Sequence, residues 1–308
     1  MNNNTLKKEY KRTFWTSLLS KIKSKAMFIP IGIILCIYAF SLLIPFVWMC
    51  YSAFKEPIDF LLNPFALPTI WHPENFAKIF NLLHVEILTD TGKEVYGLGT
   101  MLFNSFMLST GISFFGIMVP AITAYAVAKY DFIGKKIIYN IAIITMIIPI
   151  VGNLPSSLSI RKALGIINNP ALYILTCAQP FGFNFLLLYG MFKGISWTYA
   201  EAVFIDGGGH FTVLFKVMFP LALPTLATVF ILAFIGNWND YMTVLTYLWK
   251  VPNLAFGMYM FQNEAARYGA TMPEVLAGLI LAAIPSATLY LASQKLILSK
   301  FAVGGLKG

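Results

Sequence analysis

Charged side chains are scarce in this chain. They make up 11% of its 308 residues, whereas about 25% is usual for a soluble globular domain. Hydrophobic residues make up 58%. This composition excludes an ordinary soluble domain and predicts a protein that is embedded in a lipid bilayer.

Cysteine and histidine are also rare. The residues are Cys36, Cys50, Cys177, His72, His84 and His210. The cysteines are odd in number and lie inside apolar runs, and there is no C-x-x-C pattern, so a disulfide framework is not expected. The histidines are far apart in sequence and lack H-x-x-x-H spacing, so no metal site is predicted.

A phosphate-binding loop is missing as well. Gly207-Gly208-Gly209 is the longest glycine run, and it is not followed by the Lys-Ser/Thr pair of an ATP-binding loop. The chain is therefore not expected to hydrolyse ATP, to have catalytic residues or to carry a cofactor of its own.

Six long charge-free runs occupy most of the chain, the shortest with 20 residues and the longest with 34. A helix needs roughly 20 apolar residues to cross a bilayer, and helices satisfy their own backbone groups in lipid. We therefore predict an all-α, polytopic membrane protein with six transmembrane helices. The expected spans are about 27–53, 100–128, 137–158, 171–192, 219–247 and 274–298.

Lysine and arginine set the expected orientation. Counted by predicted side, 15 lie on the side of the termini and 7 on the other, and the positive-inside rule assigns the larger set to the cytoplasm. The predicted parts are a cytoplasmic tail (1–26), a transmembrane domain (27–298) and a cytoplasmic end (299–308). Within the domain, loop 55–99 is external and loop 193–218 is cytoplasmic. The net charge of +9 suits this topology and anionic lipid, and the spread of the basic residues along membrane flanks argues against a nucleic-acid partner.

Loop 193–218 has more local structure than a simple connector needs. Thr198 and Glu201 have the spacing of a capping box, and glycine at 207–209 ends the predicted helix. Its expected apolar side is Ala200, Ala202, Val203 and Ile205. A short helix held at the membrane surface between two spans predicts a handle by which another protein moves them.

The same loop resembles the EAA loop of ABC importer permeases, whose pattern is E-A-A, three residues, G, and then a proline-marked return to the membrane. The matching positions are Glu201, Ala202, Gly207, Pro220 and Pro224, and Val203 departs from the usual third alanine. The stretches 45–55 (PFVWMCYSAFK), 237–241 (NWNDY) and 303–308 (VGGLKG) resemble the same family. Together they indicate the binding-protein-dependent carbohydrate importers, and within them the maltose-permease G-type subunit.

This resemblance implies a non-catalytic permease subunit in a bacterial cytoplasmic membrane that takes up a sugar or oligosaccharide. The implied partners are a second, different permease subunit, two cytoplasmic ATPase subunits that bind ATP and Mg, and an extracytoplasmic sugar-binding protein. The coupling residues implied by the match are Glu201, Ala202, Asp206, Gly207 and Gly208.

Polar residues inside the predicted spans are candidates for the substrate path, because such groups are costly in lipid. Asp240 is the one carboxylate well inside an apolar run. Its neighbours Asn237, Trp238, Asn239 and Tyr241 are of the types that hold sugars, although interfacial anchoring explains them equally well. Further candidates, for which interhelical hydrogen bonding is the alternative, are Asn153, Gln179 and Asn184.

Other classes of protein remain open at this point. An ion-driven secondary transporter would need intramembrane ionisable relays or broken repeats, for which Asp240 alone qualifies. An ABC permease for a phosphorylated polyol would be expected to bring arginine into the pore, and Arg161 and Arg267 lie in predicted outer loops. A membrane-embedded enzyme would need clustered His, Asp or Ser in the spans.

Overall fold

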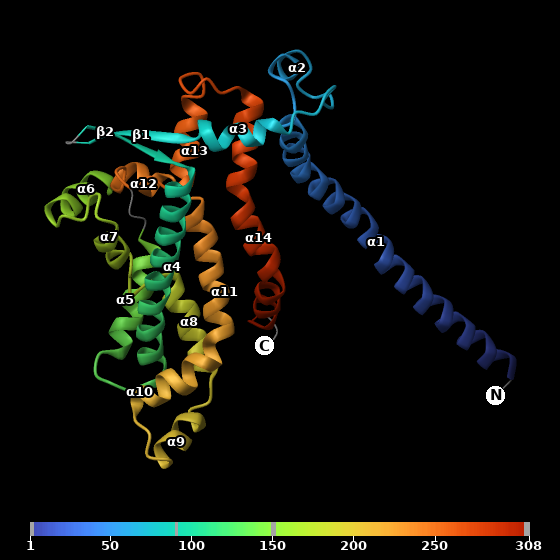
Figure 1. The fold of residues 1–308 in the computed structure, drawn as a ribbon. Helices are drawn as coiled ribbons and strands as arrows, with labels where there is room; N and C mark the ends of the chain where they lie inside the picture. Colours follow the sequence, from blue (N-terminus) through green and yellow to red (C-terminus); the bar gives the residue numbers. More distant parts are fainter. Residues whose placement is uncertain (1–2, 90–91, 149–151, 305–308) are drawn as a thin grey trace. The chain divides into compact units, whose positions relative to one another are not determined.

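The computed structural model describes residues 3–89, 92–148 and 152–304, and it is mostly helical. The chain divides into two compact units, 1–73 and 74–308. Figure 1 follows the chain through both units. Each unit is described by itself below.

The first unit consists of α1 (Asn3–Ser52), α2 (Pro57–Leu62) and the loops around α2. Near the end of α1, the Trp48 indole donates to the carbonyl of Pro64 at 2.8 Å and the Tyr51 hydroxyl donates to that of Phe65 at 2.9 Å. The apolar part of the helix, Phe28–Ser52, leaves nearly all of its large side chains exposed. Such a surface is stable only against lipid or another apolar partner.

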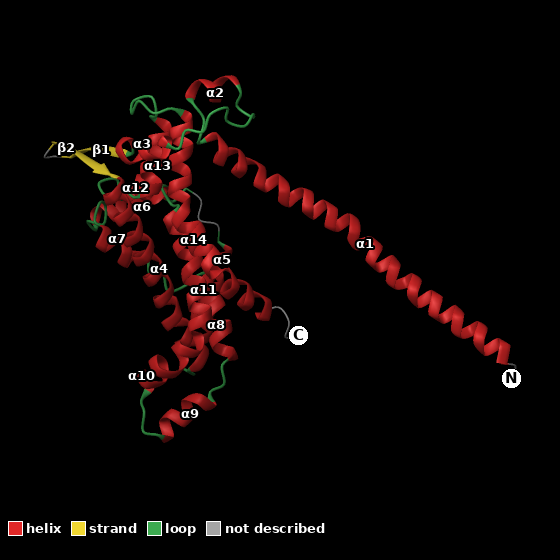
Figure 2. Cartoon of the chain, turned by 45° about the vertical axis from the view of Figure 1, so that its right-hand side comes forward, coloured by secondary structure: helices red, strands yellow, loops and turns green. Residues whose placement is uncertain are grey.

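The second unit is built on three long helices: α4 (Leu98–Lys129), α11 (Phe219–Trp238) and α14 (Met272–Gly304). Helix α4 packs against α11 and against α8 (Phe183–Gly194), and α11 also packs against α14. Figure 2 shows these helices side by side. The shorter helices α5 (Lys135–Ile147), α6 (Leu154–Ala163) and α7 (Pro170–Thr176) connect α4 to α8.

The two ends of this bundle carry different structures (Figure 1). At one end lie α3 (Glu74–Leu82), α12 (Met242–Tyr247) and α13 (Leu254–Asn263), together with a hairpin of β1 (His84–Thr89) and β2 (Gly92–Gly97). At the other end lie α9 (Thr198–Ile205), α10 (His210–Thr212) and a π-helical turn, η1 (Val213–Met218). The loop 193–218 and the hairpin are therefore at opposite ends of the second unit.

Four helices in the described ranges are long and apolar enough to cross a membrane: Phe28–Ser52, Leu98–Lys129, His210–Trp238 and Met272–Ile297. The expected third and fourth spans are not continuous helices. Helix α5 stops at Ile147 and α6 starts at Leu154, while α7 stops at Thr176 and α8 starts at Phe183. Glycine and proline between these pieces explain the breaks, since Gly152 has a φ of 76° and Pro180 removes a backbone donor.

The expected fifth span, 219–247, differs from the structure at both ends. The helix begins at His210 and continues through η1 into α11, which ends at Trp238. The Asp240 carboxylate accepts a hydrogen bond from the amide of Thr243 at 3.0 Å and so helps to start the separate helix α12. The polar cluster 237–241 is thus the end of one helix and the start of another.

The expectation of an all-α chain misses the hairpin. Strands β1 and β2 are antiparallel, with His84 opposite Gly97 and Thr89 opposite Gly92. Val85 and Ile87 alternate inward, which is the period-2 pattern of a half-buried strand. On the other face, Glu86 pairs with Lys93 at 2.6 Å and with Arg267 at 3.1 Å. The hydrogen bond from Lys93, aided by both positive charges, lowers the pKa of Glu86 from its ordinary value against a smaller effect of desolvation.

Candidate functional site

Helix α9 ends in a Schellman turn. The amide of Gly208 donates to the carbonyl of Val203 at 2.8 Å, and the amide of Gly207 donates to that of Phe204 at 3.1 Å. These bonds satisfy carbonyls that the end of a helix would otherwise leave without partners. The turn fixes where the short helix stops and how the chain leaves it.

Both bonded glycines are needed for this turn. Gly207 has a φ of 78°, the left-handed region that other residues rarely adopt. Gly208 is needed for space, because a Cβ atom there would lie 2.5 Å from Cγ1 of Val203. By contrast, Gly209 has a φ of −100° and open space around it. The sequence predicted that glycine breaks the helix at 207–209. The structure shows that the turn needs glycine at 207 and 208 and not at 209.

The two faces of α9 differ from the expected pattern. Ala200 is fully buried, and Val203 and Phe204 pack against the core formed by α4, α8 and α11. These three positions follow the i, i+3, i+4 spacing of one helix face. Ala202 and Ile205 do not share that face; they are exposed, Ile205 by 86%. The prediction of a single apolar side containing all four residues is therefore wrong, since half of them point away from the protein.

The expected capping box is also absent. Helix α9 has Trp197 at its N-cap position and no side-chain hydrogen bond there. Instead, the hydroxyl of Ser196 accepts from the amide of Thr198 at 3.3 Å and donates to its hydroxyl at 3.0 Å. Glu201 lies in the first turn with its side chain exposed. The carboxylate is therefore turned outward rather than folded back onto the helix start.

An aromatic cluster attaches this loop to α4. The ring of Tyr130, just after α4, lies 5.5 Å from Trp197 and 5.4 Å from His210, and Phe204 lies 5.0 Å from His210. The hydroxyl of Tyr130 bonds to Nδ1 of His210 at 2.9 Å and to the hydroxyl of Tyr125 at 3.0 Å. Residues on both sides of the glycine turn are thereby tied to the end of a long helix.

Replacing Tyr130 with phenylalanine is expected to loosen the loop without unfolding the bundle. The ring contacts remain and two hydrogen bonds are lost, each worth about 0.5–1.5 kcal/mol. Hydrogen exchange of the amides in 203–208 should become about tenfold faster. Tyr139→Phe is a matched control. The ring of Tyr139, in α5, packs on the ring of Tyr189, in α8, and both residues lie outside the loop. Unchanged exchange in Tyr130→Phe would show that the hydrogen bonds of the Tyr130 hydroxyl do not hold the loop in place.

The loop runs into the bundle without a break. Helix α10, the π turn η1 and α11 follow one another directly, and the amide of Phe219 donates to the carbonyl of Leu214 with π-helical spacing. Val213 and Met218 are fully buried in the same core as Ala200. The loop that holds α9 is therefore connected to α11 through both the backbone and the core.

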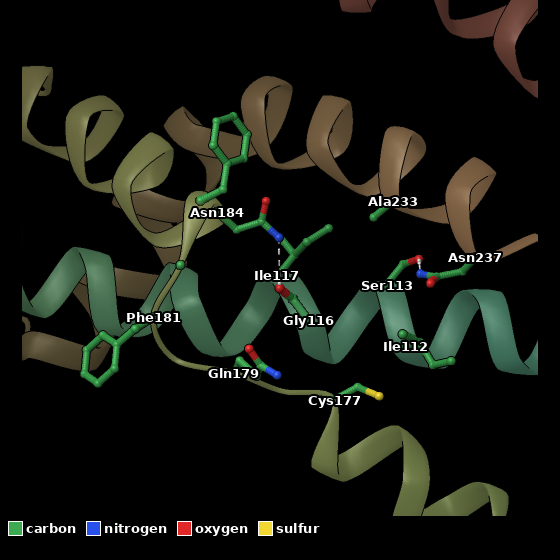
Figure 3. Close-up of a pocket in the computed structure, with 12 residues that line it drawn as sticks. Ile112, Ser113, Gly116, Ile117, Cys177, Gln179, Phe181, Asn184, Ala233 and Asn237 are labelled. Carbon is green, nitrogen blue, oxygen red and sulfur yellow. Dashed lines mark hydrogen bonds between the residues drawn. The ribbon is translucent and has the colours of Figure 1, made fainter. Parts of the chain in front are cut away.

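A second candidate site is a pocket of about 310 Å³ inside the bundle (Figure 3). Helix α4 contributes Ser113 and Gly116, the break between α7 and α8 contributes Cys177 and Gln179, and α11 contributes Ala233. The irregular backbone between α7 and α8 thus lines a cavity, which is where non-helical backbone is tolerated within a membrane.

Three of the candidate substrate-path residues meet at this pocket. Asn184 donates to the carbonyl of Gly116 at 3.3 Å, and Asn237 donates to the hydroxyl of Ser113 at 2.9 Å. Figure 3 shows Asn184 directed toward Gly116 and Asn237 toward Ser113, both on α4, with Gln179 on the segment between α7 and α8. Amide and hydroxyl groups from four segments therefore surround one cavity, an arrangement that can bind a polyhydroxylated molecule.

The other candidates lie elsewhere. The Trp238 indole donates to the carbonyl of Ala282 at 3.2 Å, and Tyr241 stacks on Tyr259 at 4.5 Å. Asn239, just after α11, donates to the carbonyl of Ile235 in that helix, and Asp240 accepts from the amide of Thr243 in α12. Asn153 lines a different cavity beside α6. Of the segment 237–241, only Asn237 reaches the pocket shown in Figure 3.

Sequence reasoning missed Tyr130 and Ser113, which the structure brings to these sites. Tyr130 is 80 positions from its partner His210, and Ser113 is 124 positions from the predicted candidate Asn237. No local pattern connects such pairs. In the part of the chain that the structure describes, no group of three or more His, Cys, Asp or Glu side chains could hold a metal ion.

The comparisons with known proteins agree on one family. Residues 116–303 match the family described as "Binding-protein-dependent transport system inner membrane component". The chain is 26% identical over 281 residues to the "Probable ABC transporter permease protein YurM" of Bacillus subtilis, covering 90% of this chain and 88% of that protein. It is 27% identical over 210 residues to the "Diacetylchitobiose uptake system permease protein NgcG" of Streptomyces coelicolor, covering 68% and 65%.

A solved structure shows the same fold. It is described as a bacterial ABC transporter involved in the import of the acidic polysaccharide alginate. The TM-score is 0.68 at 23% identity, over 88% of this chain and 96% of that chain. The helical arrangement described above is therefore that of an ABC importer permease.

Proposed function

Because this chain belongs to the family of binding-protein-dependent transport system inner membrane components, we propose that it is a permease subunit of an ATP-driven importer of a sugar or oligosaccharide. Among its relatives, NgcG is named for diacetylchitobiose uptake, and the structural neighbour for alginate import. Both cargoes are carbohydrates, one neutral and one acidic. These names support a carbohydrate as the cargo, and they do not decide whether it is neutral or acidic.

One observation carries the proposal: α9 has an inner face in the bundle core and an outer face exposed. Ala200 is fully buried, while Tyr199 is 53% and Ile205 86% exposed. A helix that is packed on one side and apolar on the other is suited to a groove on a partner protein. We assign this role to an ATPase subunit, with contacts from Glu201 and Ala202 and the turn residues Asp206, Gly207 and Gly208.

The mechanism follows from how α9 is attached. ATP would close a pair of ATPase subunits and carry α9 with them, and the tied helices α4 and α11 would move as one body. ATP and a loaded binding protein then both favour the outward-open state, which shifts the population toward it. The chemistry of ATP and Mg belongs to the ATPase subunits, and this chain supplies positions for binding and for transmitting motion.

The membrane topology is part of the proposal. The family lies in the cytoplasmic membrane, and we assign six crossings to 27–298. The third crossing contains α5, and the fourth is discontinuous and consists of α7 and α8. Loop 193–218 then faces the cytoplasm with both termini, and loop 55–99 faces outward. The location of α9 and the hairpin at opposite ends of the second unit supports this orientation. The remaining partners are a second permease subunit and an extracytoplasmic binding protein.

The ion-driven alternative is less well supported. A proton or ion relay requires a carboxylate that can exchange its partner during transport. The Asp240 carboxylate instead accepts from the amide of Thr243 at the start of α12. An exposed coupling helix would also have no role in such a transporter.

We assign the pocket of Gln179, Asn184 and Asn237 to the sugar path. Replacing Asn184 with leucine should raise the KM for the cargo about tenfold, since one lost hydrogen bond to a bound ligand costs on the order of 1 kcal/mol or more. Uptake kinetics in proteoliposomes measure this change. Asn263→Leu, in α13 with its amide on the carbonyl of Tyr259, is the control that should leave KM unchanged. An unaltered KM in Asn184→Leu would remove that residue from the path.

The test of the proposed function is reconstitution. The chain is purified with the subunits that accompany it in detergent and placed in liposomes, and ATP hydrolysis is measured with a panel of sugars and binding proteins. We expect ATP hydrolysis to be stimulated only when the binding protein, a carbohydrate and this chain are all present. Vanadate should block this stimulation. Uptake driven by an ion gradient without ATP would overturn the assignment.

A further inference from the structure

Arg161 on α6 has an unusual environment. Its guanidinium carbon lies 4.9 Å from the ring centres of both Tyr173 and Tyr247. Its Nε donates to the hydroxyl of Ser157 at 3.4 Å, and Nη1 donates to that of Thr176 at 3.2 Å. The cation is thus positioned by two aromatic rings and two hydroxyl groups, contributed by α6, α7 and α12.

None of these partners carries a negative charge. Among the described residues, the ion pairs involve other cations, and no carboxylate lies within 4.0 Å of Arg161. The side chain is half-buried rather than free in solvent. A guanidinium that is held by rings and hydroxyl groups, with no ion pair, keeps the capacity to bind an anion.

The helices are joined here without the charge. The amide of Asn168 donates to the carbonyl of Tyr247 at 2.8 Å, and the amide of Lys250 donates to Oδ1 of Asn168 at 3.0 Å. These bonds connect the turn between α6 and α7 to the end of α12. These segments are therefore also joined by bonds that do not involve Arg161.

Arg161 also faces a cavity of about 390 Å³. Its polar lining is Asn153, Ser156, Ser157, Arg161 and Thr176. The volume falls in the range of small-molecule sites. Guanidinium binds a carboxylate through a planar pair of hydrogen bonds, and hydroxyl and amide groups suit the rest of a sugar ring. A single cation in the lining matches a singly charged group better than a doubly charged phosphate.

The cavity adjoins the route assigned to the cargo. Thr176 lines it, and the next residue, Cys177, lines the pocket shown in Figure 3. Helices α6, α7 and α12 lie toward the hairpin end of the bundle (Figures 1 and 2), which the proposed topology places outside. A cargo released at that end would meet Arg161 before it reached Asn184 and Asn237.

We propose that the Arg161 cavity recognises a singly charged acidic group on the cargo, so that this transporter imports acidic carbohydrates such as oligosaccharides of uronic acids. This inference rests on the proposed function and narrows its substrate class. Arg161 acts as a specificity residue: it binds the carboxylate, and it takes no part in moving the helices.

The test uses the complete transporter with its binding protein in proteoliposomes. The probes are trisaccharides of galacturonate, glucuronate and mannuronate, each paired with its neutral methyl ester. We expect uptake and ATP hydrolysis with at least one acid and at least tenfold less with its ester. Arg161→Gln should raise the KM for that acid by tenfold or more and leave kcat within twofold.

Two further variants separate recognition from folding. Arg161→Lys keeps the charge without the planar pair, so it should retain the preference for the acid with a smaller rise in KM. Lys162→Gln removes an exposed charge next to the site and should change nothing. Transport of neutral sugars alone, or an equal loss for acid and ester in Arg161→Gln, would overturn the inference. Failure of every carbohydrate, acidic and neutral, would instead overturn the proposed function.

Discussion

Replacing Gly207 with valine is expected to reduce import by at least tenfold while the chain still inserts and assembles in the membrane. A β-branched residue at a φ of 78° is strained by roughly 1–3 kcal/mol. The turn would relieve that strain by opening, which breaks the bond from the amide of Gly208 to the carbonyl of Val203. Helix α9 would then no longer move as a rigid extension of the bundle.

The measurement is sugar uptake together with ATP hydrolysis in the reconstituted transporter. Hydrolysis that continues while uptake falls is the expected sign of lost coupling. Gly209→Ala is the matched control, because its φ is −100° and a Cβ atom meets nothing within 4 Å; it should transport normally. Normal uptake by Gly207→Val would show that the shape of this turn is not needed for transport.

Replacing Glu201 with lysine is the second change with a large expected effect. The side chain is exposed in the first turn of α9, so the fold should tolerate the change, at a cost of about 0.3–1 kcal/mol from the unfavourable charge near the helix start. At the contact with the ATPase, reversing a charge that has a partner costs roughly 2–5 kcal/mol. Binding of the ATPase subunits should therefore weaken by at least about thirtyfold.

Co-purification of the ATPase subunits at increasing salt, with uptake measured in parallel, tests this expectation. Asp131→Lys reverses another carboxylate that is fully exposed, in the connection between α4 and α5. It is outside α9 and should leave assembly intact. If Glu201→Lys retained its ATPase subunits and its transport rate, the outer face of α9 would lose its assigned partner.

The glycine turn at the end of α9 could be predicted from sequence because its chemistry is local. A left-handed glycine at the end of a short helix leaves a signature within a few residues. The direction of its faces could not be predicted, because a surface that binds a partner and a surface that packs in the core are both apolar. Ala200 and Ala202 are the same residue type two positions apart, and only the position of α4, α8 and α11 makes one buried and the other exposed.

The candidate substrate residues show the same limit over longer distances. The cluster 237–241 looked like one site because its residues are adjacent in sequence. A helix end separates them: Asn237 is still in α11 and reaches Ser113, whereas Asp240 accepts a hydrogen bond from Thr243 in the next helix, α12. Gln179 and Asn184 join Asn237 because a break between α7 and α8 places them opposite α4 and α11.

The spans were predicted best where one helix is uninterrupted. Length and composition identify α4 and α14 directly. They overestimate the third and fourth spans, since hydropathy measures how apolar a stretch is and does not measure whether its backbone stays helical. The alternation of Val85 and Ile87, with Gly92 at the turn, is a pattern typical of a hairpin. The hairpin was not predicted because this pattern lies in a polar loop of a membrane protein.

The π turn at Val213–Met218 sets how far α11 is rotated about its own axis relative to the loop 193–218. A wide turn holds one more residue than an α-helical turn, and each residue in an α-helix advances the direction of side chains by about 100°. Removing that surplus residue would leave α9 correctly built and α11 correctly apolar, yet would swing Asn237 away from Ser113. The orientation of Asn237 on α11 relative to the loop 193–218 is thus set by a single inserted residue.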